Sequence, residues 1–484
     1  MLFHTQPFIL GFLPIVLTGF FLSGRWGGTL WALRWLIAAS LFFYGWWDPR
    51  FLPLLIGSIV VNHAIAQTIR RRERRTARRV LIGGIALNLA VLGWFKYADF
   101  LLATVAPDRE PLGIALPLAV SFFTFQQIAA LADAYHRPAQ GPDLTRTMAY
   151  VTFFPHLIAG PLVRPGDIVP QLRAQEFEKP NPENIATGLA IFLLGLAKKL
   201  VLADMFGGFA DTGFDAAARG DVLTFFEAWY ATLAYTLQIY FDFSGYSDMA
   251  TGLARTMNIR FPLNFDSPYQ ARDIAAFWRR WHITLGLFLR DYVYIPLGGG
   301  RAGTGRRTSN LLVTMLLCGL WHGAAWRFVL WGGLHGVFLA VHARARRTGE
   351  PLPDWLAQGL TLFAVTIAWV PFRAPDLPAA WTMLRAMAGA NGAAIPTMIL
   401  EFFPPLAWIA TPVPVLPFLG DGRTLSFPEV SACLALGWFI VLAVPNVHAM
   451  SERARSWVLT ASFAFAAQAL FFAPRVTPFL YFRF

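Results

Sequence analysis

Long apolar segments, each followed by a short polar loop, run along the whole chain. A helix needs about 17–25 mostly apolar residues to cross a bilayer, and most of these segments reach or approach that length. The pattern therefore predicts an all-α polytopic membrane protein with roughly eleven crossings, the shorter segments being tilted, re-entrant or packed inside the bundle. The predicted segments are Phe8–Leu22, Leu30–Trp47, Phe51–Gln67, Val80–Phe95, Gly113–Ala134, Met148–Val163, Ile185–Leu202, Leu223–Tyr240, Leu311–Val341, Trp355–Val370, Pro405–Leu419, Val430–Pro445 and Trp457–Phe472.

The composition agrees with lipid as the surrounding solvent. Of the 484 residues, 56% are hydrophobic and 14% are charged, whereas a soluble domain has about 45–50% apolar and about 25% charged residues. The formal net charge of +12 is concentrated in short loops between the apolar segments. This distribution favours the anionic headgroups of a lipid bilayer as the partner, and we expect no nucleic-acid partner because there is no soluble basic domain.

A dense basic loop predicts the orientation of the chain. Seven arginines lie within Arg70–Arg79 and are interrupted only by Glu73, Thr76 and Ala77. The positive-inside rule places this loop in the cytoplasm. If three crossings precede it, the N-terminus faces outward.

The apolar stretch Leu311–Val341 is predicted to fold back on itself. Arginines flank both of its ends, which places both ends on the cytoplasmic side. Its 31 residues would form a helix of about 46 Å, too long for one crossing of about 30 Å and too short for two full ones. We therefore expect a re-entrant hairpin or a broken helix, with the break marked by Gly319 and Gly323. His322 would then lie near membrane depth beside irregular backbone, which is tolerated only where protein buries it or where it lines a wet cavity.

A second polar segment runs from Ala275 to Thr284 and leads to a glycine turn at residues 298–300. As a helix it is amphipathic, rich in large aromatic side chains, and too charged to cross lipid. The segment, which contains His282, therefore predicts an interfacial or re-entrant helix before the turn. A lipid-surface helix without any catalytic duty fits the same pattern equally well.

Two further segments carry polar side chains within apolar surroundings. In the first, Gln238 and Asp242 are four residues apart, as are Ser244 and Asp248, so each pair would share a helix face. The second segment comprises Ser121–Gln127, Asp133 and Arg137. Polar groups are costly inside a membrane and are usually functional. Hydrogen bonding between helices explains them equally well.

Histidine suits acyl transfer to a hydroxyl group. An imidazole titrates near neutral pH and can accept the hydroxyl proton as the new bond forms, which is worth about 10²–10⁴-fold in rate. A second polar group must stabilise the oxyanion or orient the thioester. We predict His322 for the first role and His282 for the second, whereas we expect His335 to be a hydrogen-bond donor in helix packing. Five further histidines lie near predicted segment ends or loops and are expected at the membrane interface: His4, His63, His136, His342 and His448. His156 is a further candidate for substrate contact, because it lies in a predicted re-entrant loop.

Other chemistries have little support in the sequence. It contains no Gly-x-Ser-x-Gly elbow, no Walker loop and no His-Glu-x-x-His zinc pattern. Cys318 lies four residues before His322, so an acyl-cysteine stays open as an alternative, although a small buried residue is the commoner role.

In combination, these segments resemble the membrane-bound O-acyltransferase (MBOAT) family, and within it the bacterial alginate O-acetyltransferase branch. The matches occur in order from about residue 112 to residue 345, and residues beyond Arg373 match only in hydropathy. The matching segments are Leu116–Tyr135, Phe153–Pro161, Gly195–Lys199, Gln238–Asp248, Phe277–His282 with Pro296–Gly299, and Gly319–Gly323.

The resemblance implies a helical bundle with a central tunnel. It implies that His322 is the essential histidine and that His282 occupies the family's second polar position, which is asparagine in many eukaryotic relatives. It implies no bound cofactor or metal, with acetyl-CoA as the acyl donor. The residues expected to bind substrate are Trp281, Trp321, Arg279, Asp242, Ser244, Tyr246 and Gln238.

The resemblance also implies a route across the bacterial inner membrane. The acetyl group would leave a cytoplasmic donor and reach an exported polysaccharide such as alginate, with periplasmic acetyltransferase partner proteins finishing the transfer. Two alternatives stay open: D-alanyl export for teichoic acid, and a channel or lipid scramblase without chemistry. The expected division of the chain is N-terminal transmembrane helices with the basic loop (1–110), a catalytic core (111–347) and C-terminal transmembrane helices (348–484).

Overall fold

A computed structural model describes all residues of the chain except 175–176, 302, 349–351, 403, 409, 414–426, 448–449, 451, 473–476 and 481–484. The chain forms two compact units. The first unit consists of Met1–Ala197, Gly245–Asn264 and Leu459–Tyr481, and the second contains Lys198–Ser244 and Phe265–Val458. The predicted three-part division into 1–110, 111–347 and 348–484 stays a prediction.

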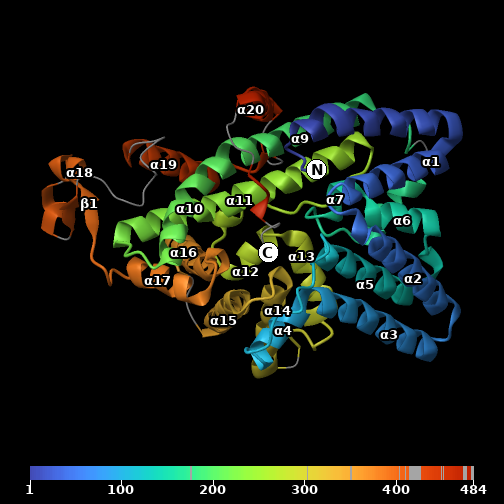
Figure 1. The fold of residues 1–484 in the computed structure, drawn as a ribbon, viewed down its shortest axis with the longest axis horizontal. Coiled ribbons are helices and arrows are strands. Elements are labelled where there is room, and N and C mark those ends of the chain that lie inside the picture. The colour runs from blue at the N-terminus through green and yellow to red at the C-terminus, as the bar shows by residue number, and fades with distance from the viewer. Residues whose placement is uncertain are drawn as a thin grey trace. The chain divides into compact units, whose positions relative to one another are not determined.

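The first unit is built from helices (Figure 1). They are α1 (Leu13–Gly45), α2 (Leu52–Arg71), α3 (Arg74–Leu92), α4 (Ala98–Val105), α5 (Val120–His136), α6 (Leu144–Thr152), α7 (Phe154–Leu157), α8 (Pro165–Ile168), α9 (Pro182–Ala197), the residues of α11 (Phe225–Thr256) from 245 onward, and most of α20 (Glu452–Phe472).

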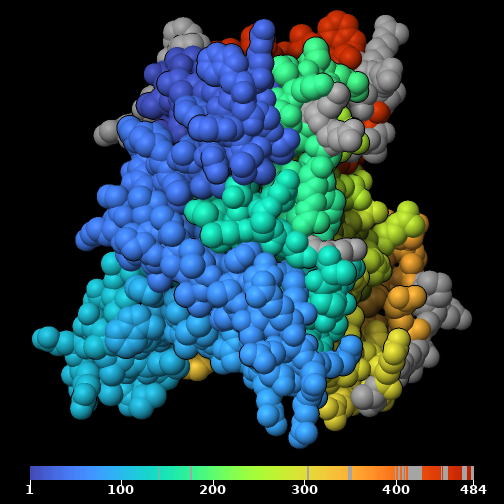
Figure 2. Space-filling view, turned by 90° about the vertical axis from the view of Figure 1, so that its right-hand side faces the viewer, coloured from blue at the N-terminus to red at the C-terminus, as the bar shows by residue number. Residues whose placement is uncertain are grey.

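Glycine and packing set the shape of the N-terminal helices. Within α1, Gly28 has φ 69°, a left-handed conformation that glycine adopts without strain, so the helix is interrupted between the two segments predicted there. Helices α2, α3 and α5 pack against one another, and α6 packs against α1 and α2. Figure 2 shows the blue residues of α1–α3 and the teal residues that follow them along the chain as one continuous surface.

The second unit contains the polar segments around His282 and His322. Its helices are α10 (Asp204–Arg219), α11 up to Ser244, α12 (Ile274–Arg280), α13 (Ile283–Leu289), α14 (Thr304–His322), α15 (Trp326–Thr348), α16 (Asp354–Arg373), α17 (Leu377–Met387), α18 (Thr397–Phe402) and α19 (Phe427–Ala443). Strands β1 (Ala394–Pro396) and β2 (Thr411–Val413) pair in parallel, with Ala394 opposite Thr411.

The predicted break in the stretch Leu311–Val341 is present. Helix α14 ends at His322, α15 begins at Trp326, and the two helices pack side by side (Figure 1). Both helices are longer than the apolar stretch, because α14 already begins at Thr304 and α15 continues to Thr348. At 1.5 Å per residue they are about 28 Å and about 35 Å long. Each is therefore long enough for a hydrocarbon core of about 30 Å or close to it. Of the two, only α15 contains, among the described residues, a segment apolar enough to cross a membrane, so the re-entrant hairpin stays a prediction.

Six helical segments among the described residues are long and apolar enough to cross a membrane. They are Pro7–Gly45, Pro49–Arg71, Arg74–Val105, Pro182–Arg219, Trp326–Arg346 and Asp354–Arg373. The first of these has 39 residues, about 58 Å as a straight helix, so it exceeds a single crossing. The all-helical multi-pass architecture is confirmed, while roughly eleven crossings and a central tunnel stay predictions.

Two predicted segments do not form long helices. Residues 148–163 contain only the end of α6 and the four-residue helix α7, and residues 149–163 are buried. In the segment Pro405–Leu419, residues 404–408 form a short turn of helix and residues 411–413 form β2, while 409 and 414–419 lie outside the described residues. The cause is proline, which removes a backbone donor and blocks helix continuation at Pro404, Pro405 and Pro412.

Candidate functional site

His322 is the last residue of α14, and glycine packing fixes its position. A Cβ atom at Gly319 would lie 2.1 Å from the carbonyl oxygen of Phe328, and one at Gly332 would lie 2.2 Å from the carbonyl oxygen of Met315. Any side chain at either position would therefore force α14 and α15 apart. The glycines allow the two backbones to touch one turn before the break, which anchors the imidazole that ends α14.

Aromatic rings enclose the imidazole of His322. Its centroid lies 4.9 Å from the Trp321 ring, 5.0 Å from the Trp331 ring and 5.2 Å from the Phe372 ring. The side chain is 5% exposed. A polar ring held inside a wall of aromatic side chains is kept in one orientation and away from bulk water, which suits a group that must meet a reacting hydroxyl in a fixed geometry.

His282 occupies the joint between α12 and α13. Helix α12 begins after Asp273, whose carboxylate accepts the Ala276 backbone N–H at 2.6 Å. The predicted single helix is divided, because His282 has φ 43°, in the left-handed region that non-glycine residues seldom adopt. Its fully buried ring lies 4.7 Å from Phe243 and 6.1 Å from Trp321. The two predicted histidines therefore contact the same indole, Trp321.

Trp281 and Arg279 lie in different surroundings. Trp281 is buried, and its ring lies 5.0 Å from Trp369 and 5.1 Å from Phe265. Trp281 thus belongs to the aromatic wall around the histidines. Arg279 is exposed, so its side chain lies at the surface of the unit and not among these rings. Their predicted contact with substrate stays a prediction. The glycine turn is present, with Gly298 at φ 110° and Gly299 at φ 57°.

The polar residues of α11 meet a lysine that the sequence reasoning did not assign a role. Asp242 is 1% exposed and forms a salt bridge of 2.8 Å with Lys199. Lys199 forms a second salt bridge of 2.8 Å with Asp204. Gln238 lies one turn before Asp242 on the same helix face, as predicted, and packs against Gly207. A protein cation thus already pairs with the carboxylate that was predicted to bind substrate.

Ser244 and Tyr246 are the other two residues that were predicted to bind substrate on α11. Ser244 is buried on α11 in the second unit. Tyr246 belongs to the first unit, where its ring stacks on Phe3 at 4.9 Å and on Phe479 at 4.5 Å. These contacts give Tyr246 an aromatic packing role within the first unit, and substrate binding by either residue stays a prediction.

The other buried histidines have protein partners. His335 is fully buried and accepts a hydrogen bond at Nδ1 from the Trp278 indole N–H at 3.3 Å, so the expected packing position is present, but His335 is the acceptor in this hydrogen bond and not the expected donor. His156 is fully buried in the first unit, with Nδ1 2.8 Å from Nε2 of Gln126. His4 was expected at the membrane interface but is 2% exposed, and His448 lies outside the described residues.

Metal ligation has no candidate site in the described part of the chain. Within it, no group of three or more His, Cys, Asp or Glu side chains is arranged to hold a metal ion. Cys318 is buried within α14.

Known proteins resemble the chain over most of its length. The model of the membrane-bound O-acyltransferase family matches residues 114–370. A peptidoglycan O-acetyltransferase of Helicobacter pylori is 42% identical over 82% of this chain and 81% of its own length. A probable alginate O-acetylase AlgI of Pseudomonas aeruginosa is 41% identical over 80% of this chain and 75% of its own length. A teichoic acid D-alanyltransferase of Streptococcus thermophilus is 27% identical over 46% of this chain and 56% of its own length.

Proposed function

We propose a reaction for this chain, which belongs to the membrane-bound O-acyltransferase family and is a multi-pass membrane enzyme. The proposed function is O-acetylation of an exported polysaccharide at the bacterial inner membrane. The acetyl group comes from a thioester donor on the cytoplasmic side, acetyl-CoA, and moves outward toward the polymer.

One observation carries the proposal. His322 stands at a helix break inside an aromatic wall, and His282 reaches the same indole from a strained joint between two other helices. Left-handed backbone at a non-glycine residue costs about 1–3 kcal/mol and persists where the surroundings enforce it, often at active sites. Two imidazoles brought together in this way fit one reaction centre better than two separate packing positions.

The chemistry needs a base and a group that stabilises negative charge. The acceptor hydroxyl oxygen attacks the carbonyl carbon of the thioester while His322 accepts the hydroxyl proton. The resulting tetrahedral intermediate carries an oxyanion, which an N–H of His282 stabilises as a hydrogen-bond donor. Collapse of the intermediate breaks the carbon–sulfur bond, and the departing thiolate takes the proton from His322. The products are the acetate ester and the free thiol.

Similarity favours acetyl over D-alanyl transfer. The O-acetyltransferase of Helicobacter pylori and the probable O-acetylase of Pseudomonas aeruginosa match about four fifths of the chain at about 40% identity. The D-alanyltransferase of Streptococcus thermophilus matches less than half of the chain at 27% identity. The names of the first two relatives give two acceptors, peptidoglycan and alginate, so the proposal covers the class of acceptor and not one polymer. Periplasmic acetyltransferase proteins that complete the transfer are part of the proposal.

The test is ester-linked acetate on surface polymer in cells that carry His322→Ala in place of the wild-type gene. We expect the acetate to fall to the level of a deletion strain, because general-base help is worth about 10²–10⁴-fold in rate. His335→Gln is the matched control, since it also removes a buried imidazole from the second unit but keeps an acceptor for the Trp278 N–H. Wild-type acetate in His322→Ala cells, with the protein present in the membrane, would overturn the proposal.

A further inference from the structure

The first unit contains a cavity that the proposed reaction does not use. It has a volume of about 410 Å³ and is lined by residues of α2, α5, α6 and α8 and of the segments that connect them. Cavities of about 300–1,000 Å³ commonly bind small ligands. Three arginines line it, Arg70, Arg137 and Arg173, against one carboxylate, Asp133, which leaves a formal charge of +2.

Buried hydrogen-bonding groups line this cavity without partners. The Gln127 side chain is 0% exposed, and within the described part of the chain neither its amide nitrogen nor its amide oxygen has a hydrogen-bond partner. The Arg70 Nε and Nη1 atoms are likewise buried without a partner among the described residues. Leaving a buried donor or acceptor unsatisfied costs about 1–3 kcal/mol, so such groups usually serve a ligand or ordered water.

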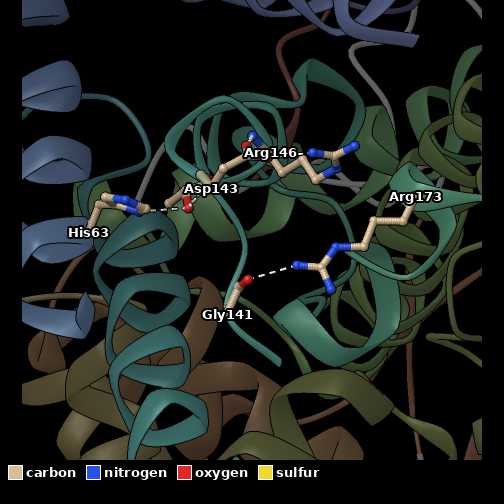
Figure 3. Close-up of polar contacts among 6 residues, drawn as sticks. His63, Gly141, Asp143, Arg146 and Arg173 are labelled. Atoms are coloured by element: carbon tan, nitrogen blue, oxygen red, sulfur yellow. Dashed lines mark hydrogen bonds and ion pairs between the residues drawn. The ribbon is translucent and has the colours of Figure 1, made fainter. Parts of the chain in front are cut away.

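One glycine holds two of the arginines in place. The Gly141 carbonyl accepts a hydrogen bond from Nη2 of Arg173 at 2.7 Å (Figure 3). On the other side, a Cβ atom at position 141 would lie 2.6 Å from Nε and Cζ of Arg70. Neither guanidinium forms a salt bridge with a carboxylate in the part of the chain that is described. Two arginines that meet at one glycine without a salt bridge form a fork that suits the oxygens of an anion.

The nearby carboxylate Asp143 is engaged elsewhere. It caps α6 by accepting the Arg146 backbone N–H at 2.8 Å, and it also accepts a bond from the Arg146 guanidinium (Figure 3). Partial burial acts to raise the pKa of Asp143, but these hydrogen bonds and the charges of Arg146 and Arg173 outweigh it and hold that pKa below its usual value. Asp143 therefore stays charged and bound to Arg146. Its charge also acts on Arg173, but no salt bridge joins the two among the described residues, so the Arg173 guanidinium keeps donors for another anion.

We propose that this cavity binds a phosphate group, held between Arg70 and Arg173, with Gln127 as a further hydrogen-bonding partner. Arg70 lies in the last turn of α2, directly before the arginines of residues 71–79, so the positive-inside rule places the fork at the cytoplasmic surface. Two sources supply phosphate there: the headgroup of an anionic phospholipid of the inner leaflet, and a soluble phosphate compound. This proposal can be tested without the acyl-transfer proposal, because the experiment measures binding of the ligand and not turnover.

The experiment measures binding to the full-length protein in detergent micelles. The lipid probe is phosphatidylglycerol, followed by native mass spectrometry, and the soluble probe is inorganic phosphate, followed by calorimetry. Arg70→Gln with Arg173→Gln should weaken at least one probe by about tenfold or more, because charge-assisted bidentate contacts are lost. Arg71→Gln with Arg72→Gln removes the same charge from exposed positions and should change binding by less than about twofold.

A charge-neutral variant separates geometry from net charge. Gly141→Ala displaces the Arg70 guanidinium without removing any charge, and it should weaken the same probe. Loss of the lipid signal alone identifies a headgroup site, and loss of the phosphate signal alone identifies a soluble ligand. If neither probe binds, or if the Arg71/Arg72 pair weakens binding as much as the Arg70/Arg173 pair, the proposal is wrong.

Discussion

The backbone of His282 limits which residues can replace it. At φ 43° an ordinary side chain is strained, and glycine and asparagine are the residues best tolerated there. The asparagine that many eukaryotic relatives are expected to carry at this position meets the same backbone demand. A polar residue at this joint therefore serves two requirements, the turn between α12 and α13 and the polar contact beside Trp321.

Replacing His282 separates these two requirements. His282→Asn keeps a side-chain donor and His282→Gly keeps none, while both tolerate the left-handed backbone. We expect acetyl transfer to be partly retained in His282→Asn and lower by about 10²-fold in His282→Gly, as for loss of an oxyanion donor. Transfer rates of purified variants measure this. Equal, wild-type rates in both variants would assign His282 to packing alone.

Lys199 shows what the sequence could not predict at this scale. Spacing alone indicated that Gln238 and Asp242 share a helix face, and they do. Spacing could not show that the lysine 43 positions before Asp242 lies 2.8 Å from its carboxylate, because that contact depends on how separate elements pack. Asp242 was singled out correctly as an unusual buried charge, and its partner was missed.

The Lys199 pairs predict a stability effect. Lys199→Met leaves Asp242 charged and buried without its cation, so we expect a loss of about 3–5 kcal/mol in the free energy of unfolding. The double variant Lys199→Met with Asp242→Asn should lose less than the sum of the single variants, because the two residues interact directly. Denaturation in detergent measures both. If Asp242→Asn abolishes turnover without changing stability, Asp242 is a substrate contact and not a structural one.

At the scale of elements, the contact between α14 and α15 positions the proposed reaction centre. The sequence predicted the break because Gly319 and Gly323 flank His322. It did not predict the full helices, because the polar start of α14 at Thr304 and the basic end of α15 do not extend the apolar pattern. The joint at His282 was also missed, since no glycine or proline marks it and tertiary packing enforces the turn.

Adjacent glycines of α15 provide a matched pair of variants. In Gly332→Ala the new Cβ atom would lie 2.2 Å from the Met315 carbonyl oxygen, whereas in Gly333→Ala the nearest atom is Leu316 Cδ2 at 3.6 Å. Gly332→Ala should therefore separate the helices, lower the free energy of unfolding by about 1–3 kcal/mol and reduce turnover. Gly333→Ala should resemble the wild type in both measurements. Similar behaviour of the two variants would refute close backbone packing as the anchor of His322.

For the whole molecule, hydropathy and charge predicted the class well. The helical multi-pass architecture and the family follow from apolar segments and ordered motifs, and the comparisons confirm both. The phosphate-binding cavity could not be predicted in the same way. Its lining extends from Asn62 to Arg173, and only packing brings those residues together, although Gln127, Asp133 and Arg137 already stood out as a polar segment.

The orientation of the whole molecule is testable across one apolar segment. The helical segment Arg74–Val105 is long and apolar enough to cross the membrane. Thr76 lies near its start and Asp108 lies just after its end, and both residues are exposed. In intact spheroplasts, a membrane-impermeant maleimide should label Asp108→Cys and spare Thr76→Cys. Inverted vesicles should give the opposite pattern. Labelling of both positions from one side would contradict the positive-inside assignment.

The most direct measurement is thiol release from acetyl-CoA in the presence of an acceptor polysaccharide, by purified protein in lipid nanodiscs, comparing wild type, His322→Gln and His335→Gln. His322 is predicted to be the group that accepts the hydroxyl proton, so His322→Gln should release thiol at least about 10²-fold more slowly than wild type. His335→Gln should stay near the wild-type rate. Equal rates in the wild type and His322→Gln would show that the imidazole enclosed at the α14–α15 break has no part in acyl transfer.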